Sequence, residues 1–409
     1  MVSFVSIKGS NSHTNSLGFD SQANFALARE IAAQITGGVT AGSIVTEEDS
    51  CGGAPTIPAG VSGALVQAHS SFAVLPAGYS IDLITKPGPA IVIGNGSDDE
   101  TILSSVKTDL FFVAASGSGT VVAGGGDSRV SVGGSGNWLL ETGGGNDVIA
   151  AIGAVNATIG AGLGDNMILL GSGHDLVTST GDDTVFGGTG WETVDASGGG
   201  KVLVQGNQSN LVFVGGAGGA TILGGSGSDT YFGSAQQTGK QLIVGGSGGN
   251  NYLFAGDGLA TLAGGGNNDL LVAYGGQNQL LIAGSGNETL MGTLSLGNDT
   301  LRAGSGNDLL TGGGGSDVFV GGSGSSTVVS GFGKQVFEFI NHEAGGSELV
   351  TGIYDPTSIK IDLDGYGSHA VDCALASQTV TNGSVTIGLA DGTKVTFQDV
   401  TSLSKSNFT

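Results

Sequence analysis

Carboxylate side chains recur at regular intervals through the middle of this 409-residue sequence. Between Gly133 and Glu338 the chain divides into 22 windows of the form G-G-x-G-x-D-x-U-x, where U is a large apolar residue. Position six is acidic in ten windows: Asp147, Asp175, Asp183, Glu192, Asp229, Asp269, Glu288, Asp299, Asp308 and Asp317. Ca²⁺ takes several oxygen ligands and prefers anionic ones. We therefore predict that these ten side chains bind calcium.

The spacing of the windows indicates a true repeat and not mere glycine richness. Of the 21 steps between windows, 14 are nine residues long and the rest are eight to twelve. Position four is glycine in 19 of the 22 windows. Position eight is apolar or aromatic in 21, and Thr158 is the exception. Such regularity is typical of a solenoid, in which each repeat contacts its neighbours.

Each window predicts a tight turn followed by a short strand. Glycine permits positive φ and close backbone approach, so the first six residues form the turn. The last three form a strand whose central residue points inward, which we expect of Leu280, Leu290, Leu301, Leu310 and Phe319. Two windows make one coil, and coils stack at about 4.8 Å. No coil buries its apolar face alone, so neighbouring coils must stack.

The best windows, 224–232 and 312–320, resemble the RTX (repeats-in-toxin), or haemolysin-type, calcium-binding repeat. The resemblance implies a right-handed parallel β-roll with Ca²⁺ held between turns by the position-six Asp and backbone carbonyls. It also implies folding coupled to calcium binding and one-step type I secretion through a C-terminal signal. The expected fold is all-β: a cap over residues 1–115, the β-roll over 116–343, and a β cap with the secretion signal over 344–409.

Alternate windows should lie on the same edge of the roll. One edge then has position-six residues Trp138, Asn156, Asp175, Glu192, Asn210, Asp229, Asn250, Asp269, Glu288, Asp308 and Ser326. The other has Asp147, Asn166, Asp183, Lys201, Ala220, Gln241, Ala260, Asn278, Asp299, Asp317 and Gln335. From Asn156 to Asp308 every residue of the first edge is Asn, Asp or Glu, which predicts an unbroken ladder of oxygen ligands. We expect calcium along this edge and little calcium in the middle of the second edge. The alternative is that Asn and Asp stack as hydrogen-bonded ladders without metal.

The ends of the chain have different patterns. Apolar residues at helical spacing predict a helix over residues 20–37, ended by Gly37 and Gly38, which serves as a cap or as a docking element. Strands are expected at 64–66, 72–75, 81–84 and 90–93. After residue 344 we expect a strand at 358–363 and a hairpin formed by 385–389 and 394–397 around Asp391-Gly392.

Composition narrows the class of partner. The chain has 12 basic and 35 acidic residues and a net charge of −23, which disfavours nucleic acid and favours cations. It has 81 glycines, but 39% of its residues are hydrophobic, which favours a buried core over disorder. We expect no membrane span, because no apolar run reaches about 18 residues. The first residues lack the features of a cleavable signal, so export would use another route. Whether Cys51 and Cys373 pair is left open.

The motifs of common hydrolases are missing. There is no His-Glu-x-x-His, and the Gly-x-Ser-x-Gly letters at 245–249 lie inside a repeat window. We therefore expect no enzyme but a calcium-binding structural protein, secreted by a Gram-negative bacterium to the cell surface or beyond. It would self-assemble into an extracellular layer, filament or biofilm matrix. The alternatives are a calcium-stiffened adhesin or ligand-binding module, with surface or matrix polysaccharide as a partner, and an enzyme with an unrecognised N-terminal site.

Overall fold

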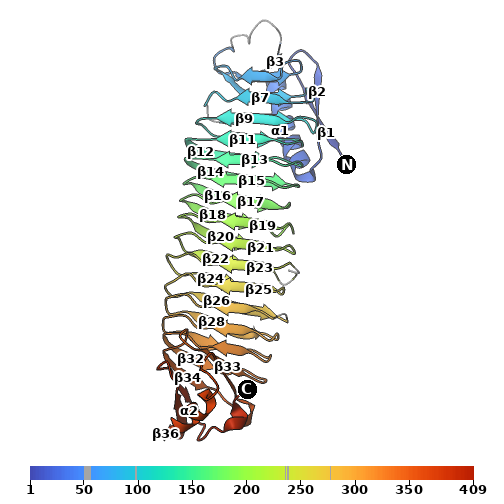
Figure 1. The fold of residues 1–409 in the computed structure, drawn as a ribbon. Coiled ribbons are helices and arrows are strands. Elements are labelled where there is room, and N and C mark those ends of the chain that lie inside the picture. The colour runs from blue at the N-terminus through green and yellow to red at the C-terminus, as the bar shows by residue number, and fades with distance from the viewer. Residues whose placement is uncertain (50–56, 97–98, 235, 237–238, 277) are drawn as a thin grey trace. The chain divides into compact units, whose positions relative to one another are not determined.

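The computed structural model describes residues 1–49, 57–96, 99–234, 236, 239–276 and 278–409. The chain divides into two compact units, an N-terminal unit of residues 1–203 and a C-terminal unit of residues 204–409. Within each unit, parallel strands of successive coils lie side by side (Figure 1). The predicted fold class, a parallel β-solenoid with an N-terminal helix and a C-terminal β cap, is confirmed.

Each unit contains strands of two parallel sheets, which we call the even sheet and the odd sheet after their strand numbers. In the N-terminal unit the even sheet has β3 (Ile44–Glu48), β4 (Ser62–Gln67), β6 (Tyr79–Ile84), β8 (Glu100–Ser104), β10 (Gly119–Val122), β12 (Ser135–Glu141), β14 (Ala154–Gly162), β16 (His174–Ser179) and β18 (Trp191–Asp195). The odd sheet has β5 (Phe72–Val74), β7 (Ala90–Ile93), β9 (Leu110–Ala114), β11 (Arg129–Val132), β13 (Val148–Ala151), β15 (Met167–Leu170) and β17 (Asp183–Phe186). Strand β19 (Val202–Gln205) lies at the division between the units.

A hairpin and one long helix cover the outer face of the even sheet in the N-terminal unit. The hairpin pairs β1 (Ser3–Lys8) with β2 (Thr14–Phe19), and α1 spans Gln22–Ala41. Apolar residues of all three elements form one core with outward side chains of β4, β6, β8 and β10. These even-sheet strands are therefore buried on both faces, which explains why adjacent residues such as Ile102 and Leu103, or Val121 and Val122, are both apolar.

In the C-terminal unit the even sheet has β20 (Asn210–Val214), β22 (Asp229–Phe232), β24 (Tyr252–Phe254), β26 (Leu270–Gly275), β28 (Thr289–Ser295), β30 (Leu309–Thr311), β32 (Ser325–Val329) and β34 (Ser347–Thr351). The odd sheet has β21 (Ala220–Leu223), β23 (Gln241–Val244), β25 (Ala260–Ala263), β27 (Leu280–Ile282), β29 (Thr300–Arg302), β31 (Val318–Val320), β33 (Val336–Ile340) and β35 (Lys360–Asp364).

An antiparallel cap closes the C-terminal unit. Strand β38 (Lys394–Phe397) pairs in parallel with β34 and antiparallel with β37 (Ser384–Gly388), which pairs with β36 (Thr379–Thr381). The helix α2 (Ala370–Ala376) and the 3-10 turns η1 (Pro356–Ser358) and η2 (Lys405–Asn407) complete the cap. The predicted hairpin is thus confirmed, whereas α2 was not predicted. Phe408 also bridges to Ile361 of β35, so the last strands of both sheets are covered.

Two sequence expectations about boundaries differ from the structure. The predicted end of the helix at Gly37 and Gly38 is wrong, because α1 continues to Ala41 and is capped by Gly42 with φ of 75°. A Cβ on Gly38 would lie 2.5 Å from the side chain of Ile44 on β3. A glycine at this position of the helix therefore makes room for that side chain. The parallel coils also begin well before residue 116, since β4 to β9 stack in the same manner as the strands that follow.

Candidate calcium sites

The ten predicted carboxylates are all buried, with at most 4% of each residue exposed. Each lies next to or at the start of a strand, two residues before an inward apolar side chain, so its own side chain faces the interior. Six lie on the even sheet: Asp175, Glu192, Asp229, Asp269, Glu288 and Asp308. Four lie on the odd sheet: Asp147, Asp183, Asp299 and Asp317.

In the C-terminal unit the inward polar residues of the even sheet form a continuous ladder. Its members, in register by the pairing of the strands, are Asp229, Asn251, Asp269, Glu288, Asp308, Ser326 and Glu348. Several coils are tied to the next by a backbone N–H that donates to a ladder side chain. The N–H of Asn251 donates to Oδ1 of Asp269 at 2.7 Å, and the N–H of Glu288 donates to Oδ1 of Asp308 at 3.0 Å.

The odd sheet of the same unit has a different ladder. Its inward positions are Ala220, Gln241, Ala260, Gln279, Asp299, Asp317 and Gln335. The first four carry no carboxylate. The N–H of Gln279 donates to Oδ1 of Asp299 at 2.8 Å, and the N–H of Asp299 donates to Oδ1 of Asp317 at 3.0 Å. Carboxylates are thus unevenly distributed between the two edges of this unit.

Five residues that the sequence placed at position six are one residue out of register. The inward residues are Ala157, Val202, Leu211, Asn251 and Gln279, whereas Asn156, Lys201, Asn210, Asn250 and Asn278 face outward. The predicted unbroken ladder from 156 to 308 is therefore wrong, because Ala157 and Leu211 interrupt it. Leu280 is likewise not the inward residue of its strand, since its neighbour Leu281 is fully buried.

The cause is the side-chain period of two. Where two successive residues are apolar, as in Tyr252-Leu253 or Leu280-Leu281, either could face the core, and a shift of one residue inverts the strand. One window did carry a signal of the shift. Thr158 broke the rule at position eight, and the inward residues of β14 are Val155, Ala157 and Ile159.

The hydrogen bonds of Oδ2, or of Oε2 in Glu288, distinguish two kinds of carboxylate among these sites. In Asp269, Asp308 and Asp317 it accepts an N–H from a glycine four residues earlier in the same turn, at 2.8 Å in each case. In Asp147, Asp175, Glu288 and Asp299 it is buried and accepts no hydrogen bond from the described residues. A buried anionic oxygen without a donor is costly, and a bound cation would remove that cost. The carboxylates of the second kind, Asp147, Asp175, Glu288 and Asp299, therefore fit calcium.

Burial also shifts the acidity of these groups. Burial raises the pKa of Asp175 to about 6 and that of Asp147 to about 7. The pKa of Glu288 rises to about 7, first through burial and then through the neighbouring Asp308. The carboxyls of Asp269, Glu288 and Asp308 lie on successive coils, so like charges repel along the ladder. A divalent cation between coils would favour the ionised forms.

The turns stack so closely that only glycine fits at certain positions. A Cβ on Gly306 would lie 1.3 Å from the carbonyl oxygen of Gly286, and one on Gly286 would lie 1.5 Å from that of Asn267. Position four is therefore glycine because the preceding coil lies against it. In these turns glycine is required because two coils lie close together, and not because the backbone has a positive φ. The same packing brings a backbone carbonyl near a carboxylate, since a Cβ on Gly246 would lie 2.6 Å from the carbonyl oxygen of Gly227 and 2.9 Å from Oδ2 of Asp229.

The described residues contain no group of three or more His, Cys, Asp or Glu side chains that converges on one point. Side chains alone would therefore give any ion too few ligands. Calcium takes six to eight oxygens, so backbone carbonyls of the stacked turns would have to supply the remainder.

Sequence reasoning missed three buried carboxyls, those of Glu348, Asp82 and Glu100. Glu348 extends the even ladder by one coil, and burial raises its pKa to about 7. Its window, 343–351, keeps Gly346 at position four and Val350 at position eight, but it lies beyond Glu338, where the counted repeat ended. Asp82 on β6 is fully buried inside the coil, and neither of its oxygens accepts a hydrogen bond from the described residues. Ile81 and Leu83, on either side of it, pack against the helix α1. Because these outward residues are apolar, the sequence pattern did not show that Asp82 faces inward.

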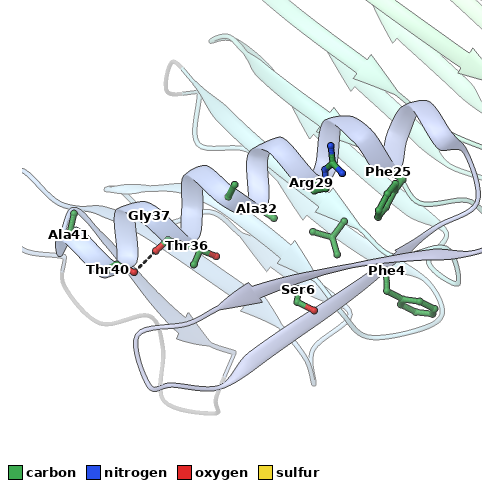
Figure 2. A pocket seen from close by; sticks show the side chains of 11 residues that line it. Phe4, Ser6, Phe25, Arg29, Ala32, Thr36, Gly37, Thr40 and Ala41 are labelled. Atoms are coloured by element: carbon green, nitrogen blue, oxygen red, sulfur yellow. Dashed lines mark hydrogen bonds between the residues drawn. The ribbon is translucent and has the colours of Figure 1, made fainter.

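A groove of about 880 Å³ lies between α1 and the β1 strand of the hairpin (Figure 2). Its described lining is mainly apolar, with Phe25 and Ala32 on the helix and Arg29 as the one charged side chain. Because the lining includes no carboxylate, the groove offers calcium no anionic ligand.

Four segments match the sequence model of the RTX calcium-binding nonapeptide repeat: 175–200, 212–237, 245–280 and 295–328. The chain carries RTX calcium-binding repeats. Such repeats bind calcium ions, and proteins that contain them are typically secreted by Gram-negative bacteria. Eight of the ten predicted carboxylates lie in the four segments, and Asp147 and Glu288 lie outside them.

No curated protein sequence matches the chain. In the part of the chain that the structure describes, no helix has both the length and the apolar character needed to cross a membrane. Whether Cys51 and Cys373 pair stays open, because Cys51 lies outside the described residues; Cys373 is exposed.

In an RTX β-roll the bound ion supplies positive charge between stacked turns. The residues that fit it best are those with a free buried oxygen, Asp147, Asp175, Glu288 and Asp299. Asp147, Asp175 and Asp299 also keep one oxygen on a backbone N–H of the adjacent coil, and Glu288 keeps one on the N–H of Gly286 in its own turn.

Proposed function

We propose that this RTX β-roll protein is secreted by a Gram-negative bacterium and self-assembles, with calcium, into an extracellular layer, filament or matrix. The observation that supports the proposal is the position of the buried carboxylates. The buried carboxylates serve the stacking of coils, and they face the interior, where no extended substrate could reach them. The proposal assigns the chain no catalytic role.

Electron microscopy of the purified chain tests the proposal. With calcium we expect ordered layers or filaments, and with EGTA we expect dispersed particles, because the ladder carboxylates would repel one another without the ion. Dispersed particles in both conditions, over a range of protein concentrations, would contradict it.

One observation supports the alternative of a ligand-binding module for polysaccharide. A groove of about 890 Å³ on the N-terminal unit is lined by polar side chains, among them Asn137, Asn156 and His174. The amide of Asn156 donates to Oδ1 of Asn137 at 3.0 Å. Beside the groove, Trp191 is 58% exposed and stacks on His174. Exposed indole and planar amides are suited to sugar rings, and binding of purified matrix polysaccharide that Trp191→Ala abolishes would favour this function.

A further inference from the structure

The outer face of the odd sheet in the N-terminal unit is apolar over six successive coils. Two outward rows run along it in strict register. The rows are Phe72, Ile91, Phe111, Arg129, Val148 and Met167, and beside them Val74, Ile93, Val113, Ser131, Ala150 and Leu169. Ten of these twelve side chains are apolar and one is charged. We call this surface the odd-sheet outer face.

The exposure of this face is large for a soluble monomer. Phe72 is 53% exposed, Val74 52%, Phe111 42% and Met167 44%. Together the exposed parts of the ten apolar residues amount to roughly 600 Å², the upper end of the largest patch on a typical monomer. A standard protein interface buries about 800 Å² on each partner. The face is therefore close to the size of one half of a stable interface.

The charge distribution indicates which partner fits. The chain has 35 acidic residues and a net charge of −23, so two copies repel over most of their surfaces. The odd-sheet outer face has no carboxylate in either row, and Arg129 is its one charge. It is thus a surface on which two copies meet without bringing carboxylates together.

The geometry of the face is self-complementary. Side chains project once per coil, at the strand spacing of about 4.8 Å, from a regular parallel sheet. Two such faces related by a two-fold axis can interdigitate as two sheets pack, at about 10 Å.

We propose that the odd-sheet outer face of the N-terminal unit is a dimer interface that takes a second copy of this chain. The proposal rests on the proposed self-assembly and names a surface for it. End-to-end contact through two bare solenoid ends is disfavoured, because β38 and Phe408 cover the last strands of the C-terminal unit. Contact through a sheet face has no such obstacle.

The test is the molar mass of the full chain with calcium, measured by light scattering and sedimentation over a range of micromolar concentrations. We expect a dimer for the natural chain. The double variant Ile91→Asp, Phe111→Asp brings four carboxylates into the interface of the dimer, and its dissociation constant should rise at least roughly tenfold. Both side chains are already exposed, so circular dichroism should be unchanged.

The matched control is Leu223→Asp, Leu242→Asp on the odd sheet of the C-terminal unit, where the two residues are 41% and 43% exposed. This control adds the same charge and should remain dimeric. A natural chain that is monomeric at all concentrations would overturn the proposal, including one that binds vesicles or polysaccharide instead. So would a double variant as dimeric as the control.

The outcome can be separated from that of the proposed function. If the double variant still forms layers or filaments in the microscope, self-assembly stands and this interface is wrong. If the natural chain forms the expected dimer and nothing larger, the interface stands and the extended assembly is wrong.

Discussion

At the scale of single residues, glycine at position four is a packing requirement of stacked turns. The carbonyl oxygen of Gly286 lies 1.3 Å from where a Cβ of Gly306 would be, so any other residue must push two coils apart. We expect Gly306→Ala to lower the free energy of unfolding by about 1–3 kcal/mol. Chemical denaturation with calcium present measures it. Gly37→Ala is the control, since nothing lies near its Cβ position within α1 and alanine favours a helix. Equal destabilisation by the two variants would contradict the packing account.

The second residue-scale prediction concerns the uneven ladders. Glu288→Gln keeps an acceptor for the N–H of Gly286 but removes an anionic ligand, so it should lower the number of calcium ions bound by at least one. Gln241→Ala should leave that number unchanged, although it removes the acceptor for the hydroxyl of Tyr231 and costs about 1–3 kcal/mol of stability. Titration calorimetry on both variants gives the counts. A loss of calcium with Gln241→Ala alone would show that the assignment of ligands to edges is wrong.

At the scale of elements, the repeat pattern determined the strands far better than their register. Glycine spacing and one inward apolar residue per window predict turn and strand, because both depend on local sequence. Which of two adjacent apolar residues faces inward depends on the neighbouring coil, so Asn251 and Gln279 could be found only in the structure. The coils before residue 116 depart from the motif in their even-sheet strands, because α1 and the hairpin cover these strands and they need apolar residues on both faces.

The C-terminal cap is the element with the clearest expected role in solubility. β38 pairs along the edge of β34, and without it that edge would offer unpaired N–H and C=O groups to another chain. We expect a chain ending at residue 352 to aggregate at micromolar concentration with calcium present, and light scattering measures this. The full-length chain, in which β38 covers this edge, is the control at the same concentration. A soluble, monodisperse 1–352 chain would contradict the role of the cap.

At the scale of the whole molecule, calcium and protons should have opposite effects on stability. Without metal, burial holds the pKa of Asp147 and Glu348 at about 7, above their ordinary values of 3.8 and 4.5. The folded chain then binds more protons than the unfolded chain between about pH 4 and pH 7, so its stability falls as pH rises through that window. With calcium, the ion requires ionised carboxylates, and acid releases it. The melting temperature in EGTA should therefore fall from pH 5 to pH 8, and in excess calcium it should rise.

Asp147→Asn tests whether the fall in stability with pH comes from the buried carboxyls or from the net charge of −23 of the whole chain. The variant keeps Oδ1 as the acceptor for the N–H of Ser128 but can no longer ionise in the interior, so the fall with pH in EGTA should become shallower. Asp257→Asn removes the same charge from an exposed position and keeps its acceptor for the N–H of Gly276, so its slope should match that of the natural chain. Calorimetric melting at four or five pH values gives all three slopes. If the natural chain in EGTA becomes more stable as pH rises, the interior carboxyls are ionised without calcium, and the ladders are hydrogen-bonded structures that need no metal.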